Sequence, residues 1–400
     1  MDSGPSQMKP SRQFRPTLNQ TDLLEDRRVL STLHPYYRQR LPIYQPLQTQ
    51  VLTTPTLPKI QTAGVRTYDL IPPPGQVNPT GTISLSYKVG GATIVPFGYA
   101  YANAHPGMTL VSVSGIPAGG SGPKSQVMSV GTLGQRQSFY QSADGEMILT
   151  PPGMFRAGFA SIGVTPTTYD SGTGVTSSQP GELRILNVVG APVMIIRDAN
   201  LVSGPTGLTW LDKGNTASLF ISNSINGVVS RFDFKIFQRG IPSIRLTKAT
   251  QIGGGYATAG SATTELQGPS GLSYDNVTDT LYVASSLNNS VYAIDRASRV
   301  RNLGGTGRVV VNNSPNLTSP KGVSLSPSRT LLVSGDLASG ATGLSEFDLS
   351  GRYIGSLPTG AAGGGASSVT WNHSLYGFGP EVVQLNANDS TIQFLPITQN

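Results

Sequence analysis

Cysteine is absent from the 400-residue chain. Its absence excludes disulfide bridges, thiolate-bound metals and cysteine nucleophiles as sources of stability or chemistry. It does not fix the compartment, because cysteine-free chains are compatible with oxidising and with reducing surroundings.

Long apolar runs are also missing. The nearest one, VVGAPVMII at 188–196, is about half as long as the ~18–20 residues that a membrane-spanning helix needs, and its length is typical of a buried strand. The first thirty residues lack the apolar core of ~7–15 residues that marks a secretory signal. The sequence therefore predicts no transmembrane segment and shows no recognisable signal peptide.

Charged residues are scarce, at 12% of the chain, which is roughly half the usual share. Surfaces of this kind are more common outside cells than inside. The net charge of +7 is spread thinly: residues 1–60 hold eight Lys and Arg against four Asp and Glu, and the remaining residues hold twenty against seventeen. A nucleic-acid binder would show a basic stripe with interleaved aromatics, so the sequence predicts no nucleic-acid partner.

Glycine and proline are abundant instead, with 48 and 30 residues distributed along the chain. That distribution favours many short strands joined by many turns. Residues 1–60 are polar, interrupted by proline and poor in strand pattern, which predicts a disordered or loosely docked arm before an all-β domain at 61–400.

A repeated unit organises the all-β part. GPTGLTW starts at Gly204, GPSGLSY at Gly268 and SPKGVSL at Ser319. Each copy continues with a second strand, at 218–223, 280–285 and 330–335, and with a third strand that ends in Asp233, Asp295 or Asp348. The distance from the motif proline to that aspartate is 28 residues (205 to 233), 26 (269 to 295) and 28 (320 to 348), so the copies keep their register.

Fainter copies start near residues 92, 150 and 365, which gives six units with the starts at 204, 268 and 319. A unit of three or four short strands cannot bury both faces of its sheet alone, and such units stack radially as the blades of a propeller. The sequence predicts a six-bladed β-propeller, with residues 60–90 supplying an outer strand that completes the last blade.

The Pro-x-Gly start of each unit has a mechanical interpretation. Proline fixes the backbone where the chain enters the crowded centre, and glycine carries no side chain that would collide with the next blade. Glycines 207, 271 and 322 are therefore predicted to be architectural, because they recur at one phase of the repeat.

The stretch GPSGLSYDNVTDTLYVASSLNNSVYAID at 268–295 resembles NHL-type propellers, above all uncharacterised bacterial proteins that are exported or lie at the cell envelope. The resemblance extends from about residue 92 to the end of the chain and leaves out residues 1–60. It implies a six-bladed propeller with no established reaction. Some NHL-like propellers are metal-dependent lactonases or lyases whose ligands converge at the mouth of the central channel.

That comparison locates the candidate site. In NHL-type blades the second strand often ends in an aspartate; the equivalent residues here are Asn223, Ser285 and Gly335, and the acidic ring is missing. Asp336 follows its strand directly. We therefore expect Asn223, Ser285 and Asp336 to line the channel mouth as binding residues, with no catalytic set. We expect no cofactor, since a calcium ion would need six or more oxygen ligands.

Two functions follow from this pattern. The favoured one is a non-enzymatic binding or structural propeller that recognises a protein or glycan through its inter-blade loops, because loops on a rigid frame are where recognition normally resides. The alternative is a metal-dependent, lactonase-like hydrolase or lyase at the central channel. An intracellular scaffold docked through its basic arm is a third, weaker hypothesis.

An extracellular or cell-envelope location is favoured by the resemblance and by the sparse charge. The segment LEDRRVLS at 24–31 also resembles a short N-terminal segment of exported proteins of planctomycete-type bacteria. A short amphipathic helix remains the simpler interpretation of those eight residues.

We predict that limited proteolysis removes residues up to about 60 and leaves a folded propeller, because the arm lacks the apolar pattern of the core. Mass spectrometry of the resistant fragment and its circular dichroism test this. Loss of folding on trimming would show that the arm belongs to the core.

Overall fold

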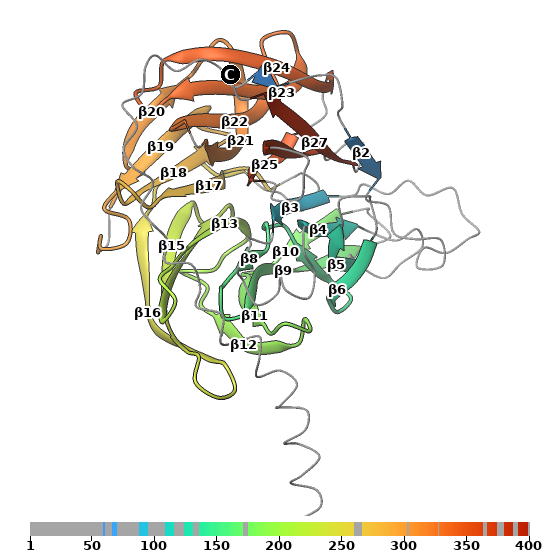
Figure 1. Ribbon diagram of the computed structural model, residues 1–400, viewed down its shortest axis with the longest axis vertical. Coiled ribbons are helices and arrows are strands. Elements are labelled where there is room, and N and C mark those ends of the chain that lie inside the picture. The colour runs from blue at the N-terminus through green and yellow to red at the C-terminus, as the bar shows by residue number, and fades with distance from the viewer. Residues whose placement is uncertain are drawn as a thin grey trace, which may run out of the picture. The chain divides into compact units, whose positions relative to one another are not determined.

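The structure is a computed structural model that describes residues 59–60, 66–69, 88–94, 109–115, 124–130, 136–170, 175–259, 266–301, 304–326, 328–362, 366–373, 380–386 and 391–398 (Figure 1). Contacts divide the chain into two units, residues 1–51 and 52–400, and every described residue belongs to the second. The predicted arm at 1–60 therefore lies outside the described residues except for Lys59 and Ile60.

Four of the sheets are built alike, each from four antiparallel strands that follow one another in the chain. The first contains β3 (Lys88–Ile94), β4 (Thr109–Gly115), β5 (Lys124–Val130) and β6 (Arg136–Gln141). The next of this kind contains β13 (Pro205–Asp212), β14 (Thr216–Asn223), β15 (Val228–Phe237) and β16 (Ser243–Gly253). The other two contain β17 (Pro269–Asp275), β18 (Thr280–Ser285), β19 (Ser290–Asp295) and β20 (Arg308–Asn312), and β21 (Leu317–Leu325), β22 (Thr330–Leu337), β23 (Ala341–Asp348) and β24 (Tyr353–Ala362).

A fifth sheet joins the two ends of the all-β part. It contains β25 (Ala366–His373), β26 (Pro380–Asn386) and β27 (Thr391–Thr398), and β27 also pairs with β1 (Lys59–Ile60) and β2 (Arg66–Asp69). The expectation that an N-terminal segment completes the last sheet is confirmed by β2. The residues assigned to that strand differ in part, because Lys88 and Val89 begin β3 of the first sheet instead.

The sheet at 146–197 departs from this order. It contains β7 (Glu146–Ile148), β8 (Gly153–Met154), β9 (Ala160–Asp170), β10 (Val175–Ser178), β11 (Glu182–Leu186) and β12 (Pro192–Arg197). Two short strands, β7 and β8, pair with β9 where the other sheets have one inner strand. Pro151 and Pro152 lie in the gap, and proline has no backbone N–H for the ladder, so the inner strand is interrupted there.

Successive sheets contact each other through their first strands: β13 contacts β17, β17 contacts β21, β21 contacts β25 and β25 contacts β3. Radially packed four-stranded sheets of this kind define a β-propeller. The predicted number of six blades is corrected. Five sheets have the regular order of a blade. In the sheet at 146–197 the inner strand is divided, and β9 continues beyond its pairing with β11 to form a hairpin with β10.

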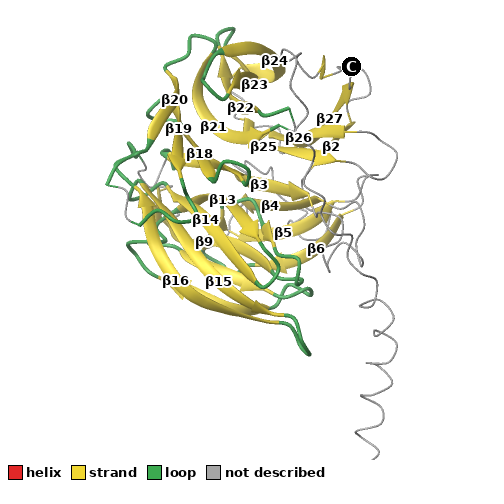
Figure 2. Cartoon of the chain, turned by 60° about the vertical axis from the view of Figure 1, so that its left-hand side comes forward, coloured by secondary structure: helices red, strands yellow, loops and turns green. Residues whose placement is uncertain are grey.

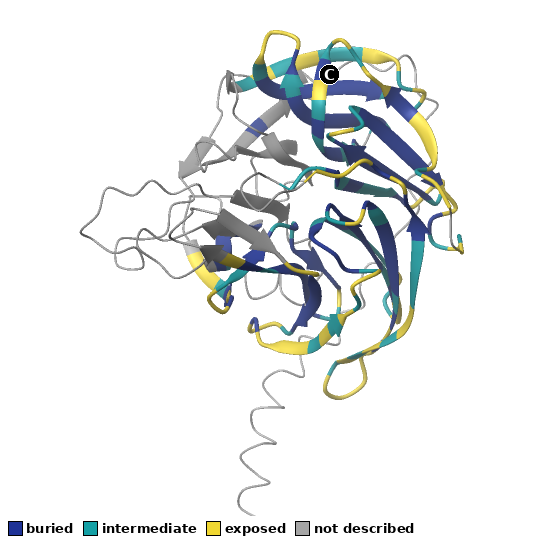
Figure 3. Cartoon of the chain, turned by 180° about the vertical axis from the view of Figure 1, so that it is seen from behind, coloured by how far each residue is buried: buried dark blue, intermediate teal, exposed yellow. Residues whose placement is uncertain are grey.

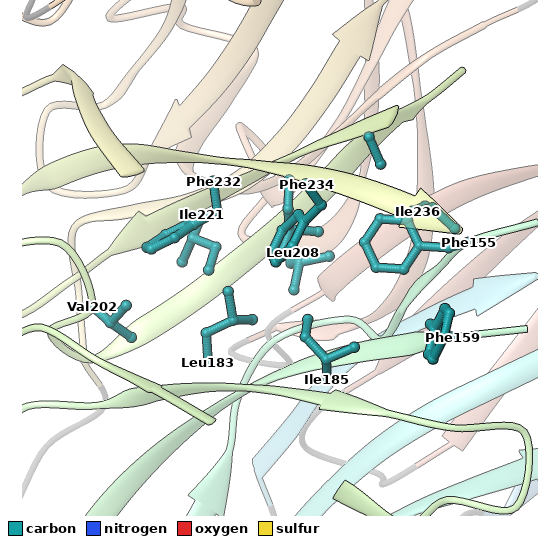
Figure 4. Close-up of a cluster of buried hydrophobic side chains, with 12 residues drawn as sticks. Phe155, Phe159, Leu183, Ile185, Val202, Leu208, Ile221, Phe232, Phe234 and Ile236 are labelled. Atoms are coloured by element: carbon teal, nitrogen blue, oxygen red, sulfur yellow. The ribbon is translucent and has the colours of Figure 1, made fainter. Parts of the chain in front are cut away.

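The apolar core lies between neighbouring sheets. Twelve buried side chains fill the space between the sheet of β7–β12 and the sheet of β13–β16 (Figure 4), and Phe155 and Phe234 meet there edge to face with ring centroids 6.0 Å apart. Burial follows the strands, and exposure is concentrated in the turns and on the outermost strands (Figure 3). Contact between sheets is therefore what excludes water from both faces of each sheet.

The Pro-x-Gly starts bring the inner strands within backbone contact. A Cβ atom added at Gly207 would lie 1.6 Å from the carbonyl oxygen of Ser270 in the next sheet. One added at Gly271 would lie 2.6 Å from the Cα of Gly322 in the sheet after that. The prediction that these two glycines are architectural is confirmed, because no side chain fits at this approach.

We predict that Gly271→Ala lowers the free energy of unfolding by roughly 1–3 kcal/mol or more, the range seen when a packed interior is overfilled. The clash is with backbone atoms, which cannot rotate away. Denaturant unfolding monitored by tryptophan fluorescence measures the loss. Gly304→Ala is the matched control, since a Cβ there has no neighbour within 4 Å, and equal stability of the two variants would contradict the prediction.

Candidate functional site

The three predicted site residues lie at or near the ends of second strands: Asn223 ends β14, Ser285 ends β18 and Asp336 is the penultimate residue of β22. These strands belong to consecutive sheets, so the structure places the three residues at the same end of their blades. Their surroundings differ, and the difference decides what each side chain can do.

Asn223 is fully buried and its amide is engaged by the protein itself. The side-chain oxygen accepts a hydrogen bond from the backbone N–H of Ser203 at 2.9 Å, and the side-chain nitrogen donates to the carbonyls of Leu201 and Val228, both at 3.1 Å. The side chain thus fixes the loop before β13 against the turn after β14. A ligand would have to break these bonds to reach it.

Ser285 is also fully buried, and its hydroxyl donates to the side-chain oxygen of Asn288 at 2.8 Å. That oxygen also accepts a hydrogen bond from the backbone N–H of Ala257 at 2.9 Å, so Ser285 positions a link to the preceding loop. Asp336 is half-buried, and its carboxylate makes no hydrogen bond or ion pair with a described residue. Of the three predicted residues, Asp336 has the side chain with free binding capacity.

Hydroxyl groups near this end join the sheets to each other. Thr206 and Ser224 each donate to the carbonyl of Pro269, at 2.9 and 3.0 Å, and Ser222 donates to the carbonyl of Ser270 at 2.8 Å. One sheet further on, Ser270 donates to the carbonyl of Lys321 at 2.8 Å. Most polar side chains near the inner strands therefore serve contacts between sheets.

Five buried hydroxyls have no hydrogen-bond partner among the described residues. Besides Thr165 and Thr250, they are three serines that share one register position, Ser112, Ser161 and Ser334. Each lies in a second strand opposite a first-strand glycine, as shown by the pairs Gly91 with Ser112, Gly153 with Ser161 and Gly322 with Ser334. Ser222 occupies the same register position and bonds to the next sheet. Unpaired buried hydroxyls of this kind are places where ordered water is usually found.

Buried charges form a second cluster, which joins β6 to the irregular sheet. The guanidinium of Arg184 donates to Glu146, to Glu182 at 3.2 Å and to the hydroxyl of Tyr140 at 2.5 Å, and Arg197 also contacts Glu182 at 3.2 Å. Burial alone would lower the pKa of Arg184, but the bonds to the two carboxylates outweigh it and raise that pKa above its usual value. The charges balance, which identifies the cluster as a structural ion-pair network.

The other sheet junctions contain similar pairs. Arg231 donates to the carbonyls of Ala297 and Val300, in the loop between β19 and β20 of the next sheet, at 2.7 and 3.1 Å. Asp275 accepts from Arg329 at 2.6 Å. Burial works to raise the pKa of Asp275, but the hydrogen bonds from Arg329 and from its own turn lower it below the usual value. These charged groups therefore also make their hydrogen bonds and ion pairs within the protein.

Glu346 is a buried carboxyl that pairs with no cation in the described part of the chain. It lies in β23 and accepts a hydrogen bond from the hydroxyl of Thr330. Burial raises the pKa of Glu346 above its usual value, and the bond from Thr330 offsets only part of that effect. The protonated form is therefore favoured by folding.

Metal-binding chemistry has little support among the described side chains, where no group of three or more His, Asp or Glu residues could hold an ion. Two of the three histidines, His34 and His105, lie outside the described residues, and His373 ends β25.

Among the described residues, no helix is long and apolar enough to cross a bilayer.

The sequence motifs did not reveal the Arg184 network or the Glu346 carboxyl. Arg184 and Tyr140 are 44 positions apart, and no repeat pattern links them. Their only sequence signal is a charge within a strand that is otherwise apolar, as in GELRIL and LSEFD.

Comparison with known proteins gives similarity in structure alone. No family model and no curated protein sequence matches the chain. A proposed oxidoreductase (glucose dehydrogenase) from Thermus thermophilus is 12% identical, covers 83% of this chain and 100% of its own, and has a TM-score of 0.42. A gluconolactonase of Xanthomonas campestris is 12% identical, covering 77% and 95%, with a TM-score of 0.39. Sqt1 of Saccharomyces cerevisiae is 10% identical, covering 79% and 97%, with a TM-score of 0.37.

We predict that Glu346→Gln removes a pH-dependent loss of stability. Because the folded pKa of Glu346 is raised, its contribution favours the fold at pH below the unfolded pKa and is lost as pH rises through the folded pKa. The wild type should therefore lose stability over that interval relative to the variant. Denaturant midpoints measured from about pH 4 to about pH 8 test this across the usual carboxyl range and above it, and parallel pH profiles of the two proteins would refute it.

Proposed function

We propose that the protein is a non-enzymatic binding propeller that recognises a protein or glycan through loops at the end of the blades where Asn223, Ser285 and Asp336 lie. The proposal is supported mainly by the hydrogen bonds of the inner polar side chains, which are made within the protein. The amide of Asn223 and the hydroxyls of Ser285, Thr206 and Ser224 are committed to holding loops and sheets together. Such a frame is suited to presenting loops.

Exposed groups at this end supply the contact surface. Leu287, in the turn between β18 and β19, is 39% exposed, and Asp336 presents a carboxylate unpaired among the described residues one sheet further on. Thr318 is exposed beside Asp336, with which it is paired in the sheet. Protein and glycan surfaces both present apolar patches and hydrogen-bonding groups. An apolar side chain together with a carboxylate and a hydroxyl can complement either kind of surface.

We further infer that the propeller is of the NHL type and that the irregular sheet stands between the sheet of β3–β6 and the sheet of β13–β16. Contacts of β7 with β4 and β5 on one side, and of β8 and β9 with β13 on the other, support this arrangement. An exported or cell-envelope location belongs to the same proposal, and the low share of charged residues supports it.

The rival function is metal-assisted hydrolysis or elimination at the channel mouth, and the available Asp336 carboxylate is the observation that favours it. An ion bound there would stabilise the folded state by mass action. Thermal unfolding in Ca²⁺, in Zn²⁺ and in EDTA separates the two functions. A binding propeller should have the same melting temperature in all three conditions. A melting temperature that rises with Ca²⁺ or Zn²⁺, and no longer does so in Asp336→Asn, would support the metal-dependent enzyme.

We predict that ligands found by screening the full-length protein on a glycan array and a displayed peptide library are lost in Leu287→Asp and Asp336→Lys. A buried negative charge or a reversed charge in the contact surface costs the interaction about tenfold or more. Val277→Asp is the matched control, since Val277 is 76% exposed in the turn at the opposite end of the same sheet. Ligands that survive the two variants, or that fail to bind Val277→Asp alone, would contradict the proposal.

A further inference from the structure

The hairpin of β15 and β16 extends beyond its neighbours (Figure 2). Exposed apolar side chains lie at its tip. Ile241, in the loop between the strands, is 91% exposed, and Phe237 at the end of β15 is 41% exposed. A Cβ at Gly240 would have no neighbour within 4 Å, so the end of the loop is open, whereas Gln238 at its base donates a hydrogen bond to the carbonyl of Gly214 at 3.0 Å. Ile241 therefore contributes almost nothing to the core.

The hairpin has one buried face and one open face. Phe234 and Ile236 pack into the core between two sheets. Side chains alternate along a strand, so Lys235 and Phe237 point to the opposite face. There the Lys235 ammonium lies 5.3 Å from the centroid of the Phe237 ring.

Four exposed cations lie along this hairpin: Lys235, Arg239, Arg245 and Lys248. Lys235 is paired in register with Arg245, and Asp233 with Lys248, so three of the cations share one face. None of the four makes an ion pair with a described residue. The nearby Asp233 carboxylate is bound by Arg231 at 3.1 Å and by Ser218 at 2.6 Å. The described surface around the tip is thus basic.

We propose that the β15–β16 hairpin docks the protein on an anionic membrane surface, with Ile241 and Phe237 entering the headgroup region and the four cations meeting lipid phosphates. Neither feature would suffice alone, because a single apolar group gives marginal membrane affinity and each surface cation adds a modest, salt-sensitive increment. Because the apolar tip and the cations lie on the same projecting hairpin, both contributions act together at one place on the membrane. The inference does not depend on the proposed protein or glycan ligand.

An acidic protein is the competing partner, and the geometry is less suited to it. A protein would need carboxylates fixed opposite each cation and a pocket shaped for Ile241. The cations lie on both strands and in the loop between them, at different distances from the tip. A fluid surface of phosphates adapts to that spread without a matched geometry.

Flotation of the full-length protein with vesicles tests the proposal. We expect binding to vesicles of phosphatidylcholine with phosphatidylserine and none to phosphatidylcholine alone, weakening as salt rises. Ile241→Asp should lower the affinity at least about tenfold by removing the apolar contact. Lys235→Gln with Arg245→Gln should lower it about thirtyfold, the effect of two surface cations.

Matched variants test the location. Leu287→Asp makes the same change at the other end of the blades, and Arg296→Gln with Arg301→Gln removes the same charge from another exposed loop. Both should bind vesicles like the wild type. Equal losses in the hairpin and control variants would show diffuse electrostatic attraction and overturn the proposal, as would absence of vesicle binding. Binding of the hairpin to poly-glutamate in place of vesicles would assign it to an acidic protein and overturn it as well.

Insertion of the tip has its own readout. The chain has no cysteine, so Ile241→Cys carries an environment-sensitive fluorophore at a single site. Its emission should shift to the blue with anionic vesicles, and the same dye on Leu287→Cys should not respond. A silent dye at residue 241 in vesicle-bound protein would exclude insertion.

Discussion

The structure depends on the close approach of inner strands at the Pro-x-Gly starts. At Gly207 and Gly271 the backbone of one sheet lies so near the next that a methyl group does not fit. This distance puts the carbonyls of Pro269, Ser270 and Lys321 within reach of hydroxyls on the neighbouring sheet. Backbone groups that would otherwise be buried unpaired thereby find partners, which makes the interface between sheets polar at its inner edge and apolar outside it.

The same approach determines which residues can serve recognition. Hydroxyls and amides that join sheets or hold loops in place are unavailable to a ligand, since breaking such a buried bond costs more than an exposed contact returns. Asn223 and Ser285 fall in this group, and Asp336 does not. Exposed side chains outside the network, at the turns and on the projecting hairpin, are the ones that the fold does not use. A rigid interior and variable loops are two results of one packing constraint.

The repeat explains why much of the fold was predictable from the sequence. Pro205, Pro269 and the glycines after them set the phase of the inner strands, and local spacing carries that information. The irregular sheet escaped prediction, although Pro151 and Pro152 are visible in the sequence, because a faint repeat does not show where a ladder breaks. The burial of Asn223 also escaped it, since that depends on how the loop at Leu201 and Ser203 folds back.

The two proposed surfaces lie at opposite ends of one strand. β15 begins at Val228, which is paired in register with Asn223, and ends at Phe237 beside the hairpin tip. Its ten residues, at about 3.3 Å each, separate these ends by roughly 30 Å. A protein held on a membrane by Ile241 would therefore keep Leu287 and Asp336 on the far side, open to a partner in solution. Because β15 is paired on both sides from Val229 to Lys235, it holds that separation constant, so membrane attachment and ligand recognition would need no conformational change.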